Sequence, residues 1–342
     1  MSDYEVPMRL DDKGRAFMDP KMFRPGTTSN RTRVRFVGGN GGMGDMICYL
    51  PCLDWIQRTQ HQLIPEFICH EFFKPIAERA LKGFKVFSFN EIDKKEEVPT
   101  KFAISENINA CGFNMVDLAF SHYANLQHPP EGEGLYPQLD VSDITYSKLP
   151  KKYAVMTPGA TTDSRSMPVP VFNEIKNHIL SLGLTPVFLG KTVIEANHIA
   201  RFLDYDFTGG VDLRDRTNLL EALKIINGSR FIVGLDNGLL HLAAMGTAPI
   251  LFGYNIASPE HRQPRRKDGI IINVTPPPQL NCRFCQSKMR FLMNAHEFKN
   301  CLYGDLKCLE LMPGSLYIKA IDAVMEHSID KDRIELALGP VS

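Results

Sequence analysis

The sequence predicts an α/β protein built from two doubly wound domains, and three observations support that fold class. Short, continuously apolar segments alternate with amphipathic segments through much of the 342 residues. That alternation is typical of parallel strands covered by helices on both faces. A glycine-rich loop stands between the first strong strand and the first helix, as it does in nucleotide-binding folds. At about 150 residues per domain, the length allows roughly two domains.

Composition and charge exclude several classes of protein. Hydrophobic residues make up 44% and charged residues 23%, which is ordinary for a globular chain. The 39 Lys and Arg balance the 39 Asp and Glu, so bulk charge does not favour a polyanion partner. No apolar run reaches the ~20 residues that span a bilayer, and residues 1–30 lack the apolar centre of a secretory signal. We therefore expect a cytoplasmic protein, with a peripheral position at the inner membrane surface as an alternative.

The first predicted domain covers residues 1–145 and opens with an irregular arm that extends to about residue 32. Glycine and proline interrupt this arm, and its apolar residues have no clear period. The elements that follow are a strand at 34–37, a glycine-rich loop at 38–45, a helix from Met46 to Ile56, a strand at 67–69, a helix near 75–81 and a strand at 84–89.

The second predicted domain covers residues 146–315, and its alternation of strands and helices is clearer. Strands are expected at 153–157, 185–189, 231–235, 249–252 and 270–274. Helices are expected near 171–182, 194–203, 219–227 and 239–245. Asn218 with Glu221 three residues later indicates a helix cap. A last helix near 316–326 begins the segment 316–342, which is expected to cross back to the first domain.

Asp45 is the first candidate for chemistry. It follows the glycine-rich loop at the start of a helix, where an aspartate commonly serves as a cap. The same position lies beyond the carboxyl end of the first strand, where ligands bind in open α/β sheets. A carboxylate there is placed to take a proton, so the residues alone leave both interpretations open.

Two further segments follow strands of the second domain. Arg165 comes after Thr157-Pro158-Gly159-Ala160, and its interpretations are a solvated loop arginine or a guanidinium that contacts a phosphate. Asp236-Asn237-Gly238 precedes a short helix that carries His241 in its first turn. The free N–H groups of such a helix start suit a diphosphate, and we expect the imidazole of His241 to face the same group.

These stretches together resemble glycosyltransferase family 9, the ADP-heptose:lipopolysaccharide heptosyltransferases and their relatives. The resemblance rests on three stretches in the family's order, from about residue 33 to residue 252: Gly44-Asp45-Met46-Ile47 with Leu50-Pro51, Thr157-Pro158-Gly159-Ala160 with Arg165 and Pro168, and Asp236 to Ala244 with Phe252-Gly253. It implies the GT-B fold, in which two Rossmann-like domains face a cleft.

The resemblance also implies roles for individual residues. Asp45 matches the family's proposed general base. The positions that match its donor-binding segments are Gly44, Pro158, Gly159, Arg165, Gly190, Glu195, Asp236, Asn237, Gly238 and His241. This chain departs from the family where Arg165 replaces the usual Lys, Met167 the usual Trp and Asn237 the usual Ser or Thr.

The implied activity is inverting transfer of a sugar from a nucleotide-diphosphate sugar to an acceptor hydroxyl, without a catalytic metal. The acceptor can be a carbohydrate, a lipid-linked sugar or a nucleic acid. Two alternatives stay open: a GT-B enzyme that glycosylates a modified nucleic-acid base, and an inactive protein that only binds a sugar nucleotide.

Two features lie outside these motifs. Cys282, Cys285, Cys301 and Cys308 match the ligand count of a structural zinc site, although reduced thiols or a disulfide also fit the spacing. The basic stretch from Arg262 to Lys267 fits either a solvated loop or a contact with an anionic acceptor.

Overall fold

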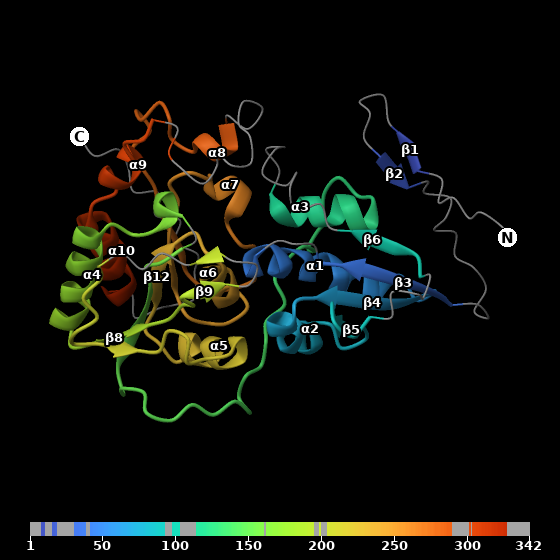
Figure 1. Cartoon of the computed structure of the whole chain (residues 1–342), viewed down its shortest axis with the longest axis horizontal. Helices are drawn as coiled ribbons and strands as arrows, with labels where there is room; N and C mark the ends of the chain where they lie inside the picture. Colours follow the sequence, from blue (N-terminus) through green and yellow to red (C-terminus); the bar gives the residue numbers. More distant parts are fainter. Residues whose placement is uncertain are drawn as a thin grey trace.

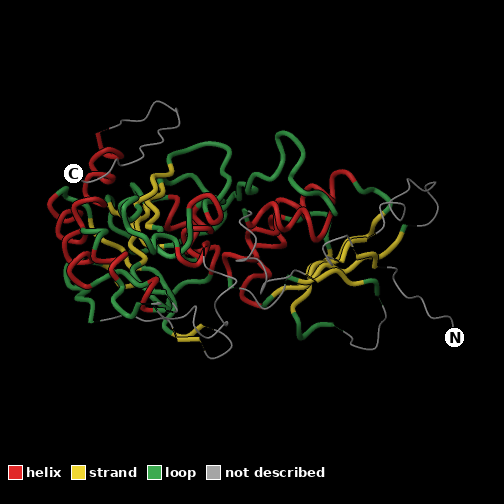
Figure 2. Tube along the Cα trace, turned by 90° about the horizontal axis from the view of Figure 1, so that it is seen from above, coloured by secondary structure: helices red, strands yellow, loops and turns green. Residues whose placement is uncertain are grey.

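A computed structural model of the chain describes residues 8–10, 16–18, 31–38, 42–92, 98–102, 114–160, 162–194, 198–199, 204–288, 301 and 303–326. Ten of its strands form two separate parallel sheets, with helices lying between the sheets, and the other described strands form two short antiparallel pairs (Figures 1 and 2). The predicted doubly wound α/β class is therefore correct. Among the helices that the structure describes, none has both the length and the apolar character needed to cross a membrane.

The first sheet has four parallel strands in the order β5-β4-β3-β6. Its strands are β3 (Thr32–Val37), β4 (Leu63–Cys69), β5 (Lys85–Ser88) and β6 (Thr100–Phe102). The helices that follow β3 and β4 are α1 (Met43–Thr59) and α2 (Lys74–Ala80). The apolar residues that predicted α1 are all buried: Met46, Ile47, Leu50, Leu53 and Ile56.

The second sheet has six parallel strands in the order β11-β8-β7-β12-β13-β14. Its strands are β7 (Tyr153–Thr157), β8 (Thr185–Phe188), β11 (Val211–Asp212), β12 (Ile232–Leu235), β13 (Ile250–Gly253) and β14 (Ile271–Val274). In chain order within this sheet the arrangement is 3-2-1-4-5-6, the order of a dinucleotide-binding fold. From β7 the chain adds strands in one direction along the sheet, to β8 and β11, and then returns to the other side of β7 with β12. The strand order therefore reverses between β7 and β12.

Helices cover both faces of the second sheet. One face carries α4 (Val169–Ser181) and α10 (Gly314–Glu326), and the other carries α5 (Leu219–Asn227) and α6 (Gly238–Ala243). Alternate residues of β7 divide between the two apolar clusters: Ala154 and Met156 enter one, and Val155 enters the other. The predicted cap of α5 is present, because Asn218 Oδ1 accepts a hydrogen bond of 2.9 Å from Glu221 N.

The cluster beneath α5 and α6 continues into the first sheet. It joins buried residues of α1 and α2 to those of α5 and α6. In the three-dimensional arrangement α1 packs on α6, and α2 packs on α5. The two sheets therefore share one apolar core through these helices.

Two predictions about secondary structure need correction. The arm before residue 32 contains two short antiparallel strands, β1 (Met8–Leu10) and β2 (Ala16–Met18). The helix expected at 194–203 is replaced by β9 (Val193–Ile194) paired with β10 (His198–Ile199) in the part that the structure describes. β-branched residues in both segments favour strands over helix there.

The last helix is present as predicted, as α10 (Gly314–Glu326). α10 packs against α4 and beside β14, with Leu316, Tyr317 and Ile321 buried in the core of the second sheet (Figure 1). Its apolar face is covered there, so the expected crossing to the first domain does not occur in residues 314–326. Residues 327–342 lie outside the described part of the chain.

Candidate active site

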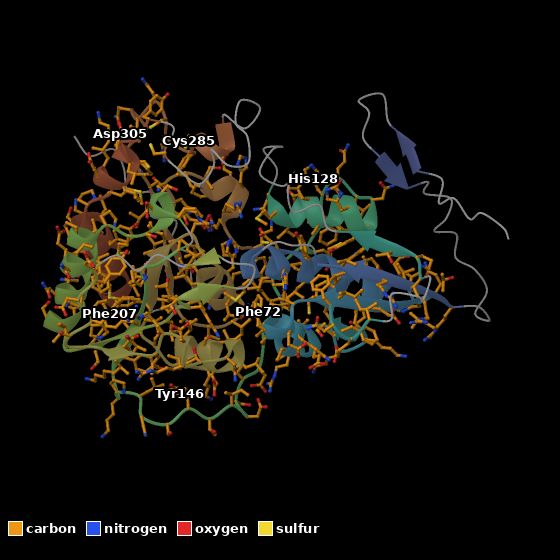
Figure 3. The ribbon with its side chains drawn as sticks, in the orientation of Figure 1. Phe72, His128, Tyr146, Phe207, Cys285 and Asp305 are labelled. Atoms are coloured by element: carbon orange, nitrogen blue, oxygen red, sulfur yellow. The ribbon has the colours of Figure 1, made fainter. Side chains whose placement is uncertain are left out.

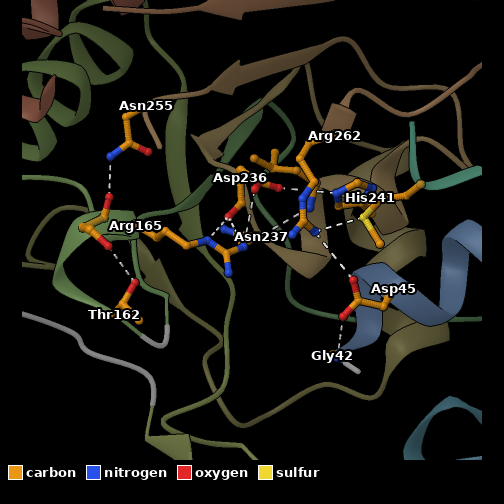
Figure 4. Close-up of polar contacts among 12 residues, drawn as sticks. Gly42, Asp45, Thr162, Arg165, Asp236, Asn237, His241, Asn255 and Arg262 are labelled. Carbon is orange, nitrogen blue, oxygen red and sulfur yellow. Dashed lines mark hydrogen bonds and ion pairs between the residues drawn. The ribbon is translucent and has the colours of Figure 1, made fainter. Parts of the chain in front are cut away.

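The candidate site lies where carboxyl ends of strands from both sheets approach each other. In the second sheet, β7 and β12 stand next to each other at the point of reversed winding, and they lead into Pro158 and Asp236. In the first sheet, β3 leads through the glycine-rich loop into α1 and Asp45. Ligands of open α/β sheets bind at such reversal points. The contact of α1 with α6 brings the two ends together (Figure 4).

Asp236 is the buried carboxylate of the site. Arg165 donates two hydrogen bonds to its carbonyl oxygen, of 3.1 Å from Nε and 2.6 Å from Nη2, and Nη2 lies 3.6 Å from Oδ2. His241 Nε2 lies 3.4 Å from Oδ1. Burial raises the pKa of Asp236, but Arg165, His241 and Arg262 outweigh burial and hold that pKa well below its usual range. Asp236 is therefore ionised at neutral pH.

His241 is a buried cation at neutral pH. Burial lowers its pKa, but Asp236 and Cys48 oppose that effect and raise the pKa to about 9. Its Nδ1 lies 3.2 Å from Tyr136 Oη, which in turn lies 2.9 Å from Cys48 Sγ. A chain of polar contacts thus runs from Asp236 after β12, through His241 and Tyr136, to Cys48 on α1. It links the second sheet to the first.

Asp45 fulfils the cap interpretation and also faces the site. Its Oδ2 accepts a hydrogen bond of 2.9 Å from Gly42 N, which caps the start of α1. Its Oδ1 lies 3.5 Å from Arg262 Nη1, and the Asp45 side chain is 24% exposed. Arg262 ends the short helix α7 (Pro259–Arg262), which follows the second sheet's β13. The two interpretations of Asp45 are therefore compatible, because each uses a different carboxylate oxygen.

The start of α6 differs from the sequence-based expectation. Asn237 Oδ1 accepts hydrogen bonds from Leu239 N at 2.9 Å and from Leu240 N at 3.3 Å. Asn237 Nδ2 lies 3.2 Å from Thr157 Oγ1, so the side chain also ties α6 to the end of β7. These two N–H groups are taken by the protein itself. They are not available to a diphosphate in this arrangement.

Gly44 and Gly238 allow the first turns of α1 and α6 to meet. A Cβ atom on Gly44 would lie 3.0 Å from His241 Cδ2, and one on Gly238 would lie 2.7 Å from Met43 Cε. A Cβ atom at either position would require the neighbouring side chain, His241 or Met43, to shift. The structure thus gives both glycines a packing role at the junction of the two sheets.

The remaining predicted donor positions lie around the second sheet. Pro158 O accepts hydrogen bonds from Met167 N at 2.9 Å and from Tyr205 Oη at 3.3 Å, and Gly159 follows in the same loop. Gly190 O accepts from Asp215 N at 3.0 Å, beyond the end of β8. Glu195 lies outside the described residues.

The sequence did not single out Tyr136, Cys48 or the individual role of Arg262. The stretch that contains Arg262 was interpreted as a solvated loop or a patch for an anionic acceptor. Instead, Arg265 Nη2 lies 2.6 Å from Asp117 Oδ1, and the buried Arg266 donates a hydrogen bond of 2.7 Å to Ala248 O. The arginines of this stretch turn toward the protein, so they do not form a basic patch.

Two of the four candidate zinc ligands lie on short helices: Cys285 begins α8 (Cys285–Lys288), and Cys308 lies in α9 (Lys307–Glu310). Figure 3 labels Cys285. Burial raises the pKa of the Cys308 thiol, a hydrogen bond from Asn255 lowers it, and the nearby Cys285, Cys282 and Cys301 raise it, to about 11. Within the part of the chain that the structure describes, no three His, Cys, Asp or Glu side chains are grouped closely enough to hold a metal ion. The zinc site stays a prediction.

Comparison with known proteins supports the resemblance found in the sequence. The model of the family described as glycosyltransferase family 9 (heptosyltransferase) matches residues 72–290. No curated protein sequence matches the chain.

Solved structures share the fold at low identity. The iron-containing dodecameric glycosyltransferase TibC of enterotoxigenic E. coli H10407 is 14% identical, with a TM-score of 0.67 over 87% of this chain and 77% of TibC. A family 9 glycosyl transferase of Veillonella parvula DSM 2008 is 12% identical, with a TM-score of 0.59 over 87% and 98%. E. coli heptosyltransferase WaaC, solved with ADP, is 14% identical, with a TM-score of 0.55 over 86% and 100%. These similarities establish a common architecture.

Proposed function

The chain belongs to glycosyltransferase family 9, the heptosyltransferase family, and we propose that it is an inverting sugar transferase with Asp45 as its general base. It has the GT-B fold of its structural neighbours and is a glycosyltransferase. The observation that carries the proposal is the position of Asp45: the first turn of α1 faces Arg262 and the Asp236–His241 pair of the opposite sheet.

The proposed donor is a nucleotide-diphosphate sugar held mainly by the second sheet. TibC has been solved with ADP-D-beta-D-heptose and WaaC with ADP, which supports a donor of this class. Arg165, at the reversal point of the sheet, is one cation that can face the donor. In this assignment residues 1–145 form the acceptor side and residues 146–315 the donor side.

In the proposed reaction, the acceptor hydroxyl attacks the anomeric carbon of the sugar while Asp45 removes the hydroxyl proton. One C–O bond forms to the acceptor as the bond from the anomeric carbon to the diphosphate breaks. The nucleoside diphosphate leaves with the electron pair, so negative charge grows on its terminal phosphate. Preorganised cations and N–H donors stabilise such charge most effectively in a site shielded from water.

The test compares Asp45→Asn with a matched control, Asp54→Asn. Asp54 lies on the same helix and pairs with Arg58 at 2.9 Å, in an exposed position. A thermal-shift panel of sugar nucleotides first identifies a donor, since a ligand at 100 times its Kd stabilises by about 2.7 kcal/mol. Asp45→Asn should keep that shift while turnover falls about 10²- to 10⁴-fold. Near-normal turnover in Asp45→Asn contradicts the assignment, and Asp54→Asn should match the wild type.

We also propose that the four cysteines hold a structural metal ion outside the reaction. Two observations support the proposal: Cys308 lies within electrostatic reach of the other three, and the neighbour TibC is described as iron-containing. Thiolates are ligands of both zinc and iron. Such an ion would connect α8 to α9 and leave proton transfer to Asp45.

A further inference from the structure

Arg262 reaches across the junction between the two sheets. It is carried by α7, which follows β13 of the second sheet, yet its Nη1 lies 3.5 Å from Asp45 Oδ1 and 3.0 Å from Met115 Sδ. Both partners belong to helices that pack with the first sheet, α1 and α3 (Met115–Ala119). Its side chain is only 13% exposed. Figure 4 shows it between Asp45 and the Asp236–His241 pair.

More cations than carboxylates take part in the ion pairs that link Arg262, Asp236 and their neighbours in the described part of the chain. Asp45 and Asp236 are the two carboxylates, and Arg165, Arg262 and His241 are the three cations. An excess charge in a largely buried group is costly unless a counter-ion compensates it. The group is therefore suited to an anion.

Two buried hydroxyls near this group lack hydrogen-bond partners among the described residues. They are Tyr49 Oη on α1 and Tyr254 Oη after β13. Burial raises the pKa of both, Asp45 contributes at Tyr49 and Asp236 at Tyr254, while Arg262 opposes the rise at each. Both hydroxyls thus belong to the electrostatic environment of Arg262. A buried O–H without a partner is rare in proteins, and a bound water or ion commonly supplies the missing acceptor.

We propose that Arg262 binds the diphosphate of the donor and stabilises the charge on the departing nucleoside diphosphate. The planar guanidinium matches two phosphate oxygens at once, which a lysine cannot reproduce. Its five N–H donors allow contact with a phosphate and with Asp45 together. This assignment rests on the proposed function and deepens it, because one side chain would then connect the general base to the leaving group.

In the transfer step, the acceptor proton passes to Asp45 as the bond between the anomeric carbon and the diphosphate oxygen breaks. The electron pair of that bond stays on the phosphate oxygen, and Arg262 faces the new charge. Arg262 touches the donor in this assignment, so its loss should affect both donor binding and turnover.

The experiment measures binding of inorganic pyrophosphate and of ADP by isothermal titration calorimetry. The full-length wild type is compared with Arg262→Gln, Arg262→Lys and the control Lys267→Gln. Lys267 is an exposed cation of the same stretch. Arg262→Gln should weaken pyrophosphate and ADP binding at least tenfold, Arg262→Lys should lie between it and the wild type, and Lys267→Gln should bind normally. Unchanged binding by Arg262→Gln overturns the proposal.

Two controls make the outcome decisive. Thermal unfolding shows whether each variant is folded. If Arg262→Gln is not, then Arg262→Lys, which keeps the charge, decides the matter: wild-type affinity and turnover in that variant overturn the proposal. A wild type that binds neither pyrophosphate nor ADP also overturns it.

The same variants separate this proposal from the proposed function. If Arg262→Gln still transfers sugar at the wild-type rate, the proposed role of Arg262 is wrong and the transferase assignment stands. If pyrophosphate binding depends on Arg262 but the wild type transfers no sugar, the proposed transferase mechanism is wrong and the anion site stands.

Discussion

The imidazole of His241 lies against Gly44, so close that a Cβ atom on Gly44 would come within 3.0 Å of His241 Cδ2. The two residues belong to helices that follow strands of different sheets, α6 and α1. His241 is held on its other sides by Asp236 and Tyr136. The imidazole therefore has little room to move, and the junction of the sheets depends on a position without a side chain.

Gly44→Ala should destabilise the protein by about 1 kcal/mol. Overpacking typically costs ~1–3 kcal/mol, and the better helix propensity of alanine returns ~0.5–1 kcal/mol. Urea unfolding measures the difference. Gly42→Ala is the control, because its Cβ would have only Asp45 Oδ2 nearby, at 3.9 Å. Equal or greater stability of Gly44→Ala would show that His241 can shift freely.

Tyr136→Phe should also lower stability, by roughly 1 kcal/mol, because the hydroxyl between His241 Nδ1 and Cys48 Sγ is lost. Tyr254→Phe is the matched control: its hydroxyl is buried without a partner among the described residues, so its removal should leave stability nearly unchanged. Chemical denaturation compares the two variants. A larger loss in Tyr254→Phe than in Tyr136→Phe contradicts the contact chain.

Stability should fall as the pH rises from about 6.5 to about 9. The pKa of His241 is raised from 6.5 to about 9 in the folded chain, so the folded state binds more protons than the unfolded state in this range. The stabilisation is complete below about pH 6.5 and is lost as the pH passes about 9, with an upper limit of roughly 3 kcal/mol. Unfolding free energies across this range, for the wild type and His241→Gln, test the point. Parallel curves for the two proteins would contradict it.

The cysteine cluster predicts about one metal ion per chain. Elemental analysis for zinc and iron, on protein purified without chelator, gives the direct measurement. Cys282→Ser and Cys308→Ser should lose the metal, whereas Cys69→Ser should keep it, because Cys69 is buried at the end of β4 in the first sheet. Metal-free wild-type protein would leave four reduced thiols. Removal of a bound ion should lower the melting temperature and leave sugar transfer in place.

Local patterns predicted where three of the candidate residues lie relative to the strands. Asp236 directly follows β12, Asp45 lies in the first turn of the helix after β3, and Arg165 lies in the segment after β7, as the parallel-sheet rule predicts. Tyr136 and Cys48 were missed because their contact joins residues 88 positions apart. No short pattern encodes such a pairing.

Arg262 and α6 show why charge and propensity patterns were insufficient. The sequence of a basic stretch does not show whether its side chains face solvent or contact buried carboxylates. In this structure Arg262 contacts Asp45. The start of α6 looked open to a ligand because the sequence cannot show which acceptor its N–H groups find. Asn237, a departure from the family pattern, supplies that acceptor. The segment 194–203 has apolar spacing that fits a helix, yet its described residues form paired strands.

The contact of α1 with α6 limits which segments of the chain can be exchanged between related enzymes. Gly44 leaves space for His241, and Gly238 leaves space for Met43, so each helix start is shaped by the other. A chimaera that takes residues 1–145 from another family member would inherit one side of this fit without the other. Recombination at the boundary near residue 145 should succeed only when residues 43–44 and 238–241 travel as a matched set. An exchange of the first sheet between related enzymes must therefore preserve the fit between the starts of α1 and α6.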